Sequence, residues 1–141
     1  MSHPAVVDYP SYSSARAHLK DVLDATEGGR SITVSRDGRV SVVVPAERLR
    51  DFFFRAVSQR VEITHDDGRV IALMVDRPFV SEGADVDGAL ADLRDSLREY
   101  ADDWEARLQH APNHRDNWAL VQLIKLSSDD ELLDWFERGG E

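Results

Sequence analysis

The chain has 141 residues, a formal net charge of −10 and no cysteine, which excludes disulfides, thiolate metal sites and cysteine nucleophiles. Apolar residues make up 42% of it, which is enough for a packed core. No apolar run is long enough to cross a bilayer, and the first ten residues lack the pattern of a secretion signal. We therefore expect a cytoplasmic protein without membrane contact.

The charge is divided unevenly along the chain. Residues 1–58 carry eight basic and seven acidic side chains, whereas residues 59–141 carry nine basic and twenty acidic ones. A near-neutral segment can approach a phosphate backbone, whereas a strongly acidic one is repelled by nucleic acid and attracted to a basic protein. The sequence therefore predicts two parts, 1–58 and 59–141, with different partners.

The first part is predicted to contain a helix, a hairpin and a second helix. The first helix spans "YSSARAHLKDVLDATEGG", with Ser13 or Ser14 as its N-cap and a glycine pair as its stop. A hairpin follows over residues 31–44 with its turn at Arg36-Asp37-Gly38. The second helix begins at Pro45, a residue that is favoured in the first turn of a helix.

The second part is predicted to contain another hairpin and three helices. The sequence Asp37-Gly38-Arg39-Val40 recurs as Asp67-Gly68-Arg69-Val70, again between β-branched runs. A long helix is expected over residues 86–108, because its apolar residues recur every three or four positions. Two short helices close the chain, the last one with Ser127 or Ser128 as its cap. The fold class is therefore expected to be α+β.

The first part resembles the Phd/YefM antitoxin family over "YSSARAHLKDVLDATEGGRSITVSRDGRVSVVVPAERLRDF". Ala15-Arg16 matches the "S-x-A-R" start of that family, and Leu19 with the Leu23 region matches its "L-x-x-L-L" core. Glu27-Gly28 matches its acidic residue followed by glycine. The run "ITVSRDGRVSVVVPAERL" is similar to the family's hairpin and following helix. The resemblance covers roughly a third of the chain.

The resemblance implies a homodimeric antitoxin that binds operator DNA, represses its own operon and neutralises a cognate toxin. Arg16 and Arg36 match positions at which the family contacts DNA. Exposed serines at a helix start can also bind phosphate, and further basic residues are candidates by charge alone. The DNA-binding candidates are Ser13, Ser14, Arg16, Lys20, Arg30, Arg36 and Arg39. Without the family match, these side chains would be read as solvated surface.

The second part departs from the short tail of that family. The segment "FVSEGADVDGALADLRDSLREY" is faintly similar to HicB-type antitoxins, although it lacks their "P-G-C" feature. Aromatic residues ringed by acids suit docking to a basic toxin of the RelE/ParE type, while the alternative is a local core that packs the terminal helices. The toxin-binding candidates are Leu97, Tyr100, Trp104, Trp118, Leu132, Trp135 and Phe136.

Catalysis is not expected. His110 and His114 have the spacing of a helical metal pair, but Pro112 lies between them and predicts a loop. The sequence has neither a glycine-rich phosphate loop nor a G-x-S-x-G nucleophile motif. We therefore predict a non-enzymatic protein without metal or cofactor. The alternative to an antitoxin is an interaction adaptor that uses the same scaffold without binding DNA.

Overall fold

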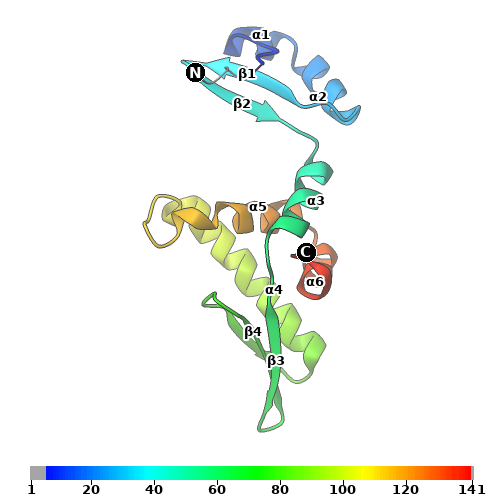
Figure 1. The fold of residues 1–141 in the computed structure, drawn as a ribbon, viewed down its shortest axis with the longest axis vertical. Helices are drawn as coiled ribbons and strands as arrows, with labels where there is room; N and C mark the ends of the chain where they lie inside the picture. The colour runs from blue at the N-terminus through cyan, green and yellow to red at the C-terminus, as the bar shows by residue number, and fades with distance from the viewer. Residues whose placement is uncertain (1–5, 141) are drawn as a thin grey trace. The chain divides into compact units, whose positions relative to one another are not determined.

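Two β-hairpins alternate with helices along the chain in the computed structural model, which describes residues 6–140 (Figure 1). The α+β class predicted from the sequence is confirmed. The helices are α1 (Tyr12–Ala17), α2 (Leu19–Glu27), α3 (Ala46–Ala56), α4 (Val86–Asp103), the π-helix η1 (Trp104–Leu108), the 3-10 helix η2 (Arg115–Asn117), α5 (Trp118–Leu126) and α6 (Asp129–Arg138). The strands are β1 (Ile32–Arg36), β2 (Arg39–Val43), β3 (Val61–Asp66), β4 (Arg69–Met74) and β5 (Val80–Gly83).

The chain forms two compact units, unit 1 up to Leu49 and unit 2 from Arg50. The boundary falls inside α3, so that this helix contributes residues to both units. The sequence predicted a division at residue 58 between two parts with different charge and different partners. That division stays a prediction.

The single helix predicted at the start of unit 1 is interrupted at His18. The backbone of His18 leaves the helical region at φ −122°, ψ 28°, and its N–H bonds to the carbonyl of Ala15. The His18 ring Nδ1 lies 2.9 Å from the Ser14 carbonyl, the group that an unbroken helix would have paired with the His18 N–H. The N-cap is Ser11 rather than Ser13 or Ser14, because its Oγ accepts from the Ser14 N–H at 3.1 Å.

Both hairpins close through two-residue Asp-Gly turns. The φ angles are 51° at Asp37 and 79° at Gly38, and 48° at Asp67 and 77° at Gly68. Two successive residues with positive φ make a type I′ turn, whose twist matches that of antiparallel strands. Within unit 1, β1 pairs with β2 on one side and with Tyr9 on the other. The two predicted hairpins are therefore confirmed.

Unit 2 contains a three-stranded antiparallel sheet in the order β3-β4-β5, and α4 packs against β4 and β5. The burial of β4 alternates, so that Val70, Ala72 and Met74 lie in the core. Strand β5 was not among the strands expected from the hairpin pattern. Its Gly83 permits a close approach of α4, since a Cβ there would lie 2.4 Å from the backbone N of Ala89.

The terminal helices α5 and α6 complete the core of unit 2. The predicted helix over residues 86–108 ends as an α-helix at Asp103 and continues as the π-turn η1. Helix α6 begins with a full capping box between Ser128 and Glu131. Ser128 is one of the two serines that were expected as the cap. Trp135 is fully buried, and its Nε1 donates to the Val57 carbonyl at 2.9 Å. This bond ties the last helix to the end of α3.

We expect Trp135→Phe to lower the free energy of unfolding by about 2–3 kcal/mol, because it removes a buried hydrogen bond and leaves a cavity. Trp118 provides the matched control, since 51% of its surface is exposed. Trp118→Phe should change the stability by less than about 1 kcal/mol. Urea unfolding followed by far-ultraviolet circular dichroism measures both. Equal losses in the two variants would contradict the assignment of Trp135 as the anchor of α6.

Candidate functional site

The structure brings some of the predicted DNA-binding residues together at one end of the first hairpin. The guanidinium of Arg36 lies over the ring of Tyr12, 5.5 Å from its centroid. Arg16 follows Tyr12 by four residues on α1, a spacing that places both on one helical face. Arg39 and Ser41 join Arg36 around a shallow surface cavity of about 440 Å³.

The remaining basic candidates in unit 1 are partly compensated by acids. Lys20 pairs with Asp24 at 2.7 Å, and Arg30 lies 3.9 Å from Asp8. Arg36 lies 3.9 Å from Asp37. Arg16 and Arg39 have no ion pair within residues 6–140. The exposed Ser13 remains a candidate, whereas the Ser14 N–H is already used by the Ser11 cap.

Unit 1 buries few apolar side chains and exposes many. Only two of its described apolar residues, Val22 and Ile32, are fully buried. Val40 and Val42 are about half exposed and share one face of β2, because alternate residues of a strand point the same way. Their cross-strand neighbours on that face, Ser35 and Thr33, are uncharged. The strand residues of this face therefore form an uncharged, partly apolar strip, here called the neutral strip, with the Asp8 carboxylate bonded to Thr33 at its border.

Most of the predicted toxin-binding residues lie in the core of unit 2. Leu97, Leu132 and Trp135 are fully buried, and Trp104 and Phe136 are 5% exposed. Tyr100 is half-buried; its Oη accepts from Asn117 Nδ2 at 2.7 Å and lies 2.9 Å from His114 Nδ1. These side chains would have to leave their packing to contact a partner. Trp118 is the member of the set that lies at the surface.

Trp118 belongs to a chain of three aromatic rings. Phe53 stands between Phe52 and Trp118, with ring centroids 5.5 Å from each, in edge-to-face contacts. Phe52 is 57% exposed and Phe53 is buried. The outer rings, here called the aromatic patch, therefore present apolar surface on a unit that is otherwise acidic. Phe52 was not among the toxin-binding residues predicted from the sequence.

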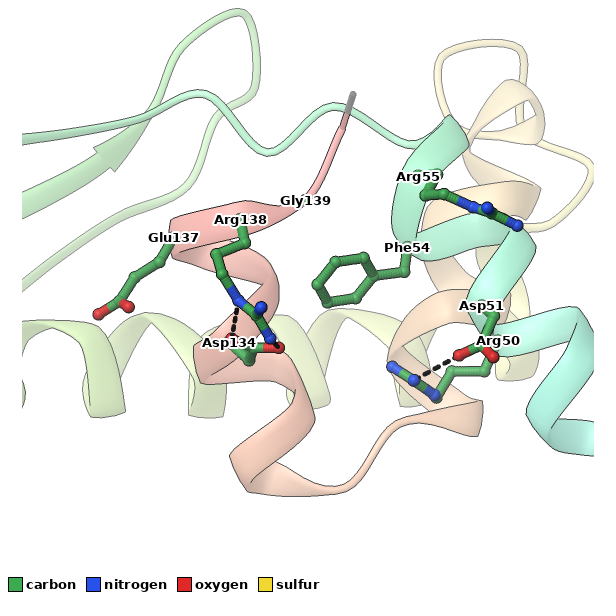
Figure 2. A pocket seen from close by; sticks show the side chains of 8 residues that line it. All are labelled: Arg50, Asp51, Phe54, Arg55, Asp134, Glu137, Arg138 and Gly139. Atoms are coloured by element: carbon green, nitrogen blue, oxygen red, sulfur yellow. Dashed lines mark hydrogen bonds and ion pairs between the residues drawn. The ribbon is translucent and has the colours of Figure 1, made fainter.

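A second feature is a groove between the end of α3 and α6, with a cavity of about 700 Å³ (Figure 2). Figure 2 shows the Phe54 ring directed between the two helices, with Arg50 turned to Asp51 and Arg138 to Asp134. The lining carries three arginines and three acids, and is therefore balanced in charge. Sequence reasoning missed this groove, because its two walls are about eighty positions apart in the chain.

Three carboxyl groups at the terminal helices have lowered pKa values. The pKa of Asp129 is lowered chiefly by its hydrogen bond with Arg98, and that of Asp134 by its bond with Arg138. The pKa of Glu131 is lowered chiefly by the backbone N–H of Ser128. Each partner favours the charged carboxylate, so that the acidic character of this end of unit 2 is fixed at neutral pH.

The described residues contain no group of three or more His, Asp or Glu side chains placed to hold a metal ion. His114 lies in the loop after η1, where its carbonyl accepts from Trp104 Nε1 at 2.8 Å, and His110 is exposed in the same loop. Within the same part of the chain, no helix combines the length and apolar character needed to span a membrane.

No protein-family model and no curated protein matches the sequence. A solved structure from Syntrophomonas wolfei subsp. wolfei matches the chain with a TM-score of 0.77 at 20% sequence identity. That protein is described as the antitoxin part of a proposed toxin/antitoxin system. The match covers 92% of this chain and 96% of that one, and the two proteins therefore share their fold over nearly their full lengths.

Proposed function

We propose that the chain is a type II antitoxin that neutralises a basic toxin and represses its own operon. The observation that carries this proposal is the full-length likeness to an antitoxin part, which includes the acidic second half as well as the hairpin unit. The resemblance of residues 12–54 to the Phd/YefM family supports it independently. Residues 1–58 would dimerise and bind operator DNA, and residues 59–141 would bind the toxin, of RelE/ParE type.

The neutral strip on the first hairpin supports a homodimer. A unit of about fifty residues with two fully buried apolar side chains gains little from its own core. A second copy would cover Val40 and Val42, whose cross-strand neighbours Ser35 and Thr33 are uncharged, and the Asp8 carboxylate bonded to Thr33 would lie at the border of the contact. We therefore place the dimer contact on this face of the hairpin.

The Val42→Asp variant should dissociate the dimer, because the contact would then bury an unpaired charge. The dimer dissociation constant should rise by about a hundredfold, which corresponds to a few kcal/mol. Sedimentation velocity of the 15.9 kDa chain measures this. Ser41→Asp adds the same charge to the opposite face of β2 and should leave the dimer intact. Equal behaviour of the two variants would place the contact elsewhere.

DNA binding is supported by the cluster of Arg16, Arg36 and Arg39. The unit is nearly neutral overall, so that affinity would depend on a few local cations, which a symmetric dimer presents twice. Arg36 is held by the Tyr12 ring, which limits the rotamer freedom that its side chain would lose on binding. The arrangement suits phosphate contacts beside a groove.

Arg16→Ala with Arg36→Ala should weaken binding to the chain's own promoter fragment and flatten its salt dependence. Each lost phosphate contact lowers the slope of log K against log salt by about one, and a dimer loses each contact twice. Arg107→Ala, an exposed arginine of unit 2, is the control. Unchanged affinity and slope in the double variant would exclude these residues as DNA contacts. If the wild type neutralises a toxin but does not bind this DNA, the adaptor function is correct instead.

Toxin neutralisation is supported by the acidic charge of the second part together with the aromatic patch. Exposed aromatic side chains dominate the binding energy of many interfaces, and surrounding charges of one sign raise the rate of encounter with an oppositely charged partner. The core residues of unit 2 would act indirectly, by holding Trp118 and Phe52 in place before the toxin binds.

The experiment that tests the function is binding to the basic protein encoded by the neighbouring reading frame, together with rescue of growth when that protein is expressed. Trp118→Ala with Phe52→Ala should weaken binding by about ten- to a hundredfold. Val86→Ala removes an exposed apolar side chain elsewhere on unit 2 and should leave binding unchanged. Thermal melting checks that the variants are folded. If the wild type neither binds nor protects, the antitoxin function is wrong.

A further inference from the structure

The sheet of unit 2 has two edges that differ in how they are covered. Strand β5 spans only four residues, and it packs closely against α4. The N–H of Glu82, which points away from β4, donates to Asp92 Oδ2 on α4 at 3.2 Å. This edge is therefore short and closed at Glu82 by a side chain of α4, one of the ways in which natural proteins protect sheet edges, while Val80 stays exposed.

The other edge, β3, is open. The Val75 N–H bonds to the Arg60 carbonyl, and the pairing register then places residues 62, 64 and 66 in hydrogen bonds with β4. The alternate residues Val61, Ile63 and His65 direct their N–H and C=O groups outward. Within residues 6–140 no hydrogen bond from these outward groups is found. Ile63 and His65 are exposed, so this row of backbone groups faces solvent.

The charge along this edge indicates the kind of strand it fits. Arg60 is paired with Asp76 at 2.9 Å, and Arg69 lies 3.6 Å from Glu82. Among the described residues, Glu62, Asp66 and Asp67 have no ion pair. Three uncompensated carboxylates within six positions disfavour antiparallel pairing with a second copy, because like charges on paired strands repel. They favour a strand that carries cations.

The side chains of the edge alternate in character. Val61 and Ile63 point to the face of the sheet that packs on α4, whereas Glu62 and Asp66 point to the other face. Helix α4 packs against β4 and β5, while Ile63 stays 37% exposed. A pairing strand would thus meet an apolar residue on one face and carboxylates on the other.

We propose that the β3 edge binds an extended segment of a partner protein in which lysine or arginine alternates with apolar residues. The segment adds a fourth strand to the sheet: its backbone pairs with Val61, Ile63 and His65, and its cations lie beside Glu62 and Asp66. The identification of this segment with part of the basic toxin rests on the proposed function. The proposal that the β3 edge binds a strand of this chemistry does not rest on it.

The direct test uses an eight-residue peptide of alternating lysine and valine with the full chain. Amide hydrogen exchange by NMR should slow by about tenfold or more at Val61, Ile63 and His65, whose N–H groups gain partners. Residues 62 and 64 already bond to β4 and should change little. A glutamate–valine peptide of the same length is the control and should give no protection.

A matched pair of proline variants tests the geometry. Ile63→Pro removes an outward N–H and spares the ladder with β4, and proline is tolerated at such edge positions. It should weaken peptide binding, measured by fluorescence anisotropy, by about tenfold. Thr64→Pro removes an inward N–H and should destabilise the sheet instead. Glu62→Lys leaves the backbone intact and should weaken binding by about threefold at low salt.

The proposal is overturned if the peptide leaves the three outward amides unprotected in the wild type, a result that does not depend on any variant folding. It is also overturned if these amides become protected as the protein alone is concentrated, since the occupant would then be a second copy. Absence of binding to the neighbour-encoded protein would refute the toxin function and leave the peptide result unaffected, so that the two failures are distinguishable. Full affinity of Ile63→Pro for that protein would overturn the assignment of the edge to the toxin.

Discussion

The apolar stripe of α4 is the contact on which unit 2 depends. Leu93 and Leu97 are fully buried, and α4 contacts β4 and β5 as well as α5 and α6. Arg98 on the same helix bonds to the Ser127 carbonyl at 2.8 Å and to Asp129, which fixes the turn between the terminal helices. A segment held in this way is folded without a partner, and it therefore presents its acids and the aromatic patch on a rigid surface. Binding would then cost little ordering entropy.

Unit 1 is built on the opposite principle. Its helices and hairpin are defined by local features, namely the Ser11 cap, the His18 break and the Asp-Gly turn, rather than by a large core. Such a unit gains stability when another surface covers its exposed apolar side chains. Under the proposed function, dimerisation would present the few cations of the unit twice, which would raise the nucleic-acid affinity of a domain with almost no net charge.

The sequence was most informative where structure is set by neighbours along the chain. The Asp-Gly turns, the α4 periodicity and the cap of α6 all depend on residues within a few positions. The turns and the periodicity were predicted correctly, and Ser128 is one of the two caps that were expected. It was least informative where a distant partner decides. Trp135 could have been a docking residue or a core residue, and the choice depends on a carbonyl 78 positions away. The helix break coincides with a contact between the His18 ring and the Ser14 carbonyl, and β5 packs against α4; neither feature leaves a periodic signal in the sequence.

The recurrence of Asp-Gly-Arg-Val in both hairpins shows that a shared turn does not determine which surfaces of a hairpin stay exposed. The two turns have nearly the same φ angles. In the first hairpin β1 is flanked by Tyr9, whose N–H and C=O bond to Thr33 and Ser35, and β2 is left with a neutral face. In the second, β4 is enclosed on both sides and β3 is left open with uncompensated acids. Because the turn is common to both, the different partners proposed for the two hairpins would be set by which strand stays unpaired and which charges lie along it.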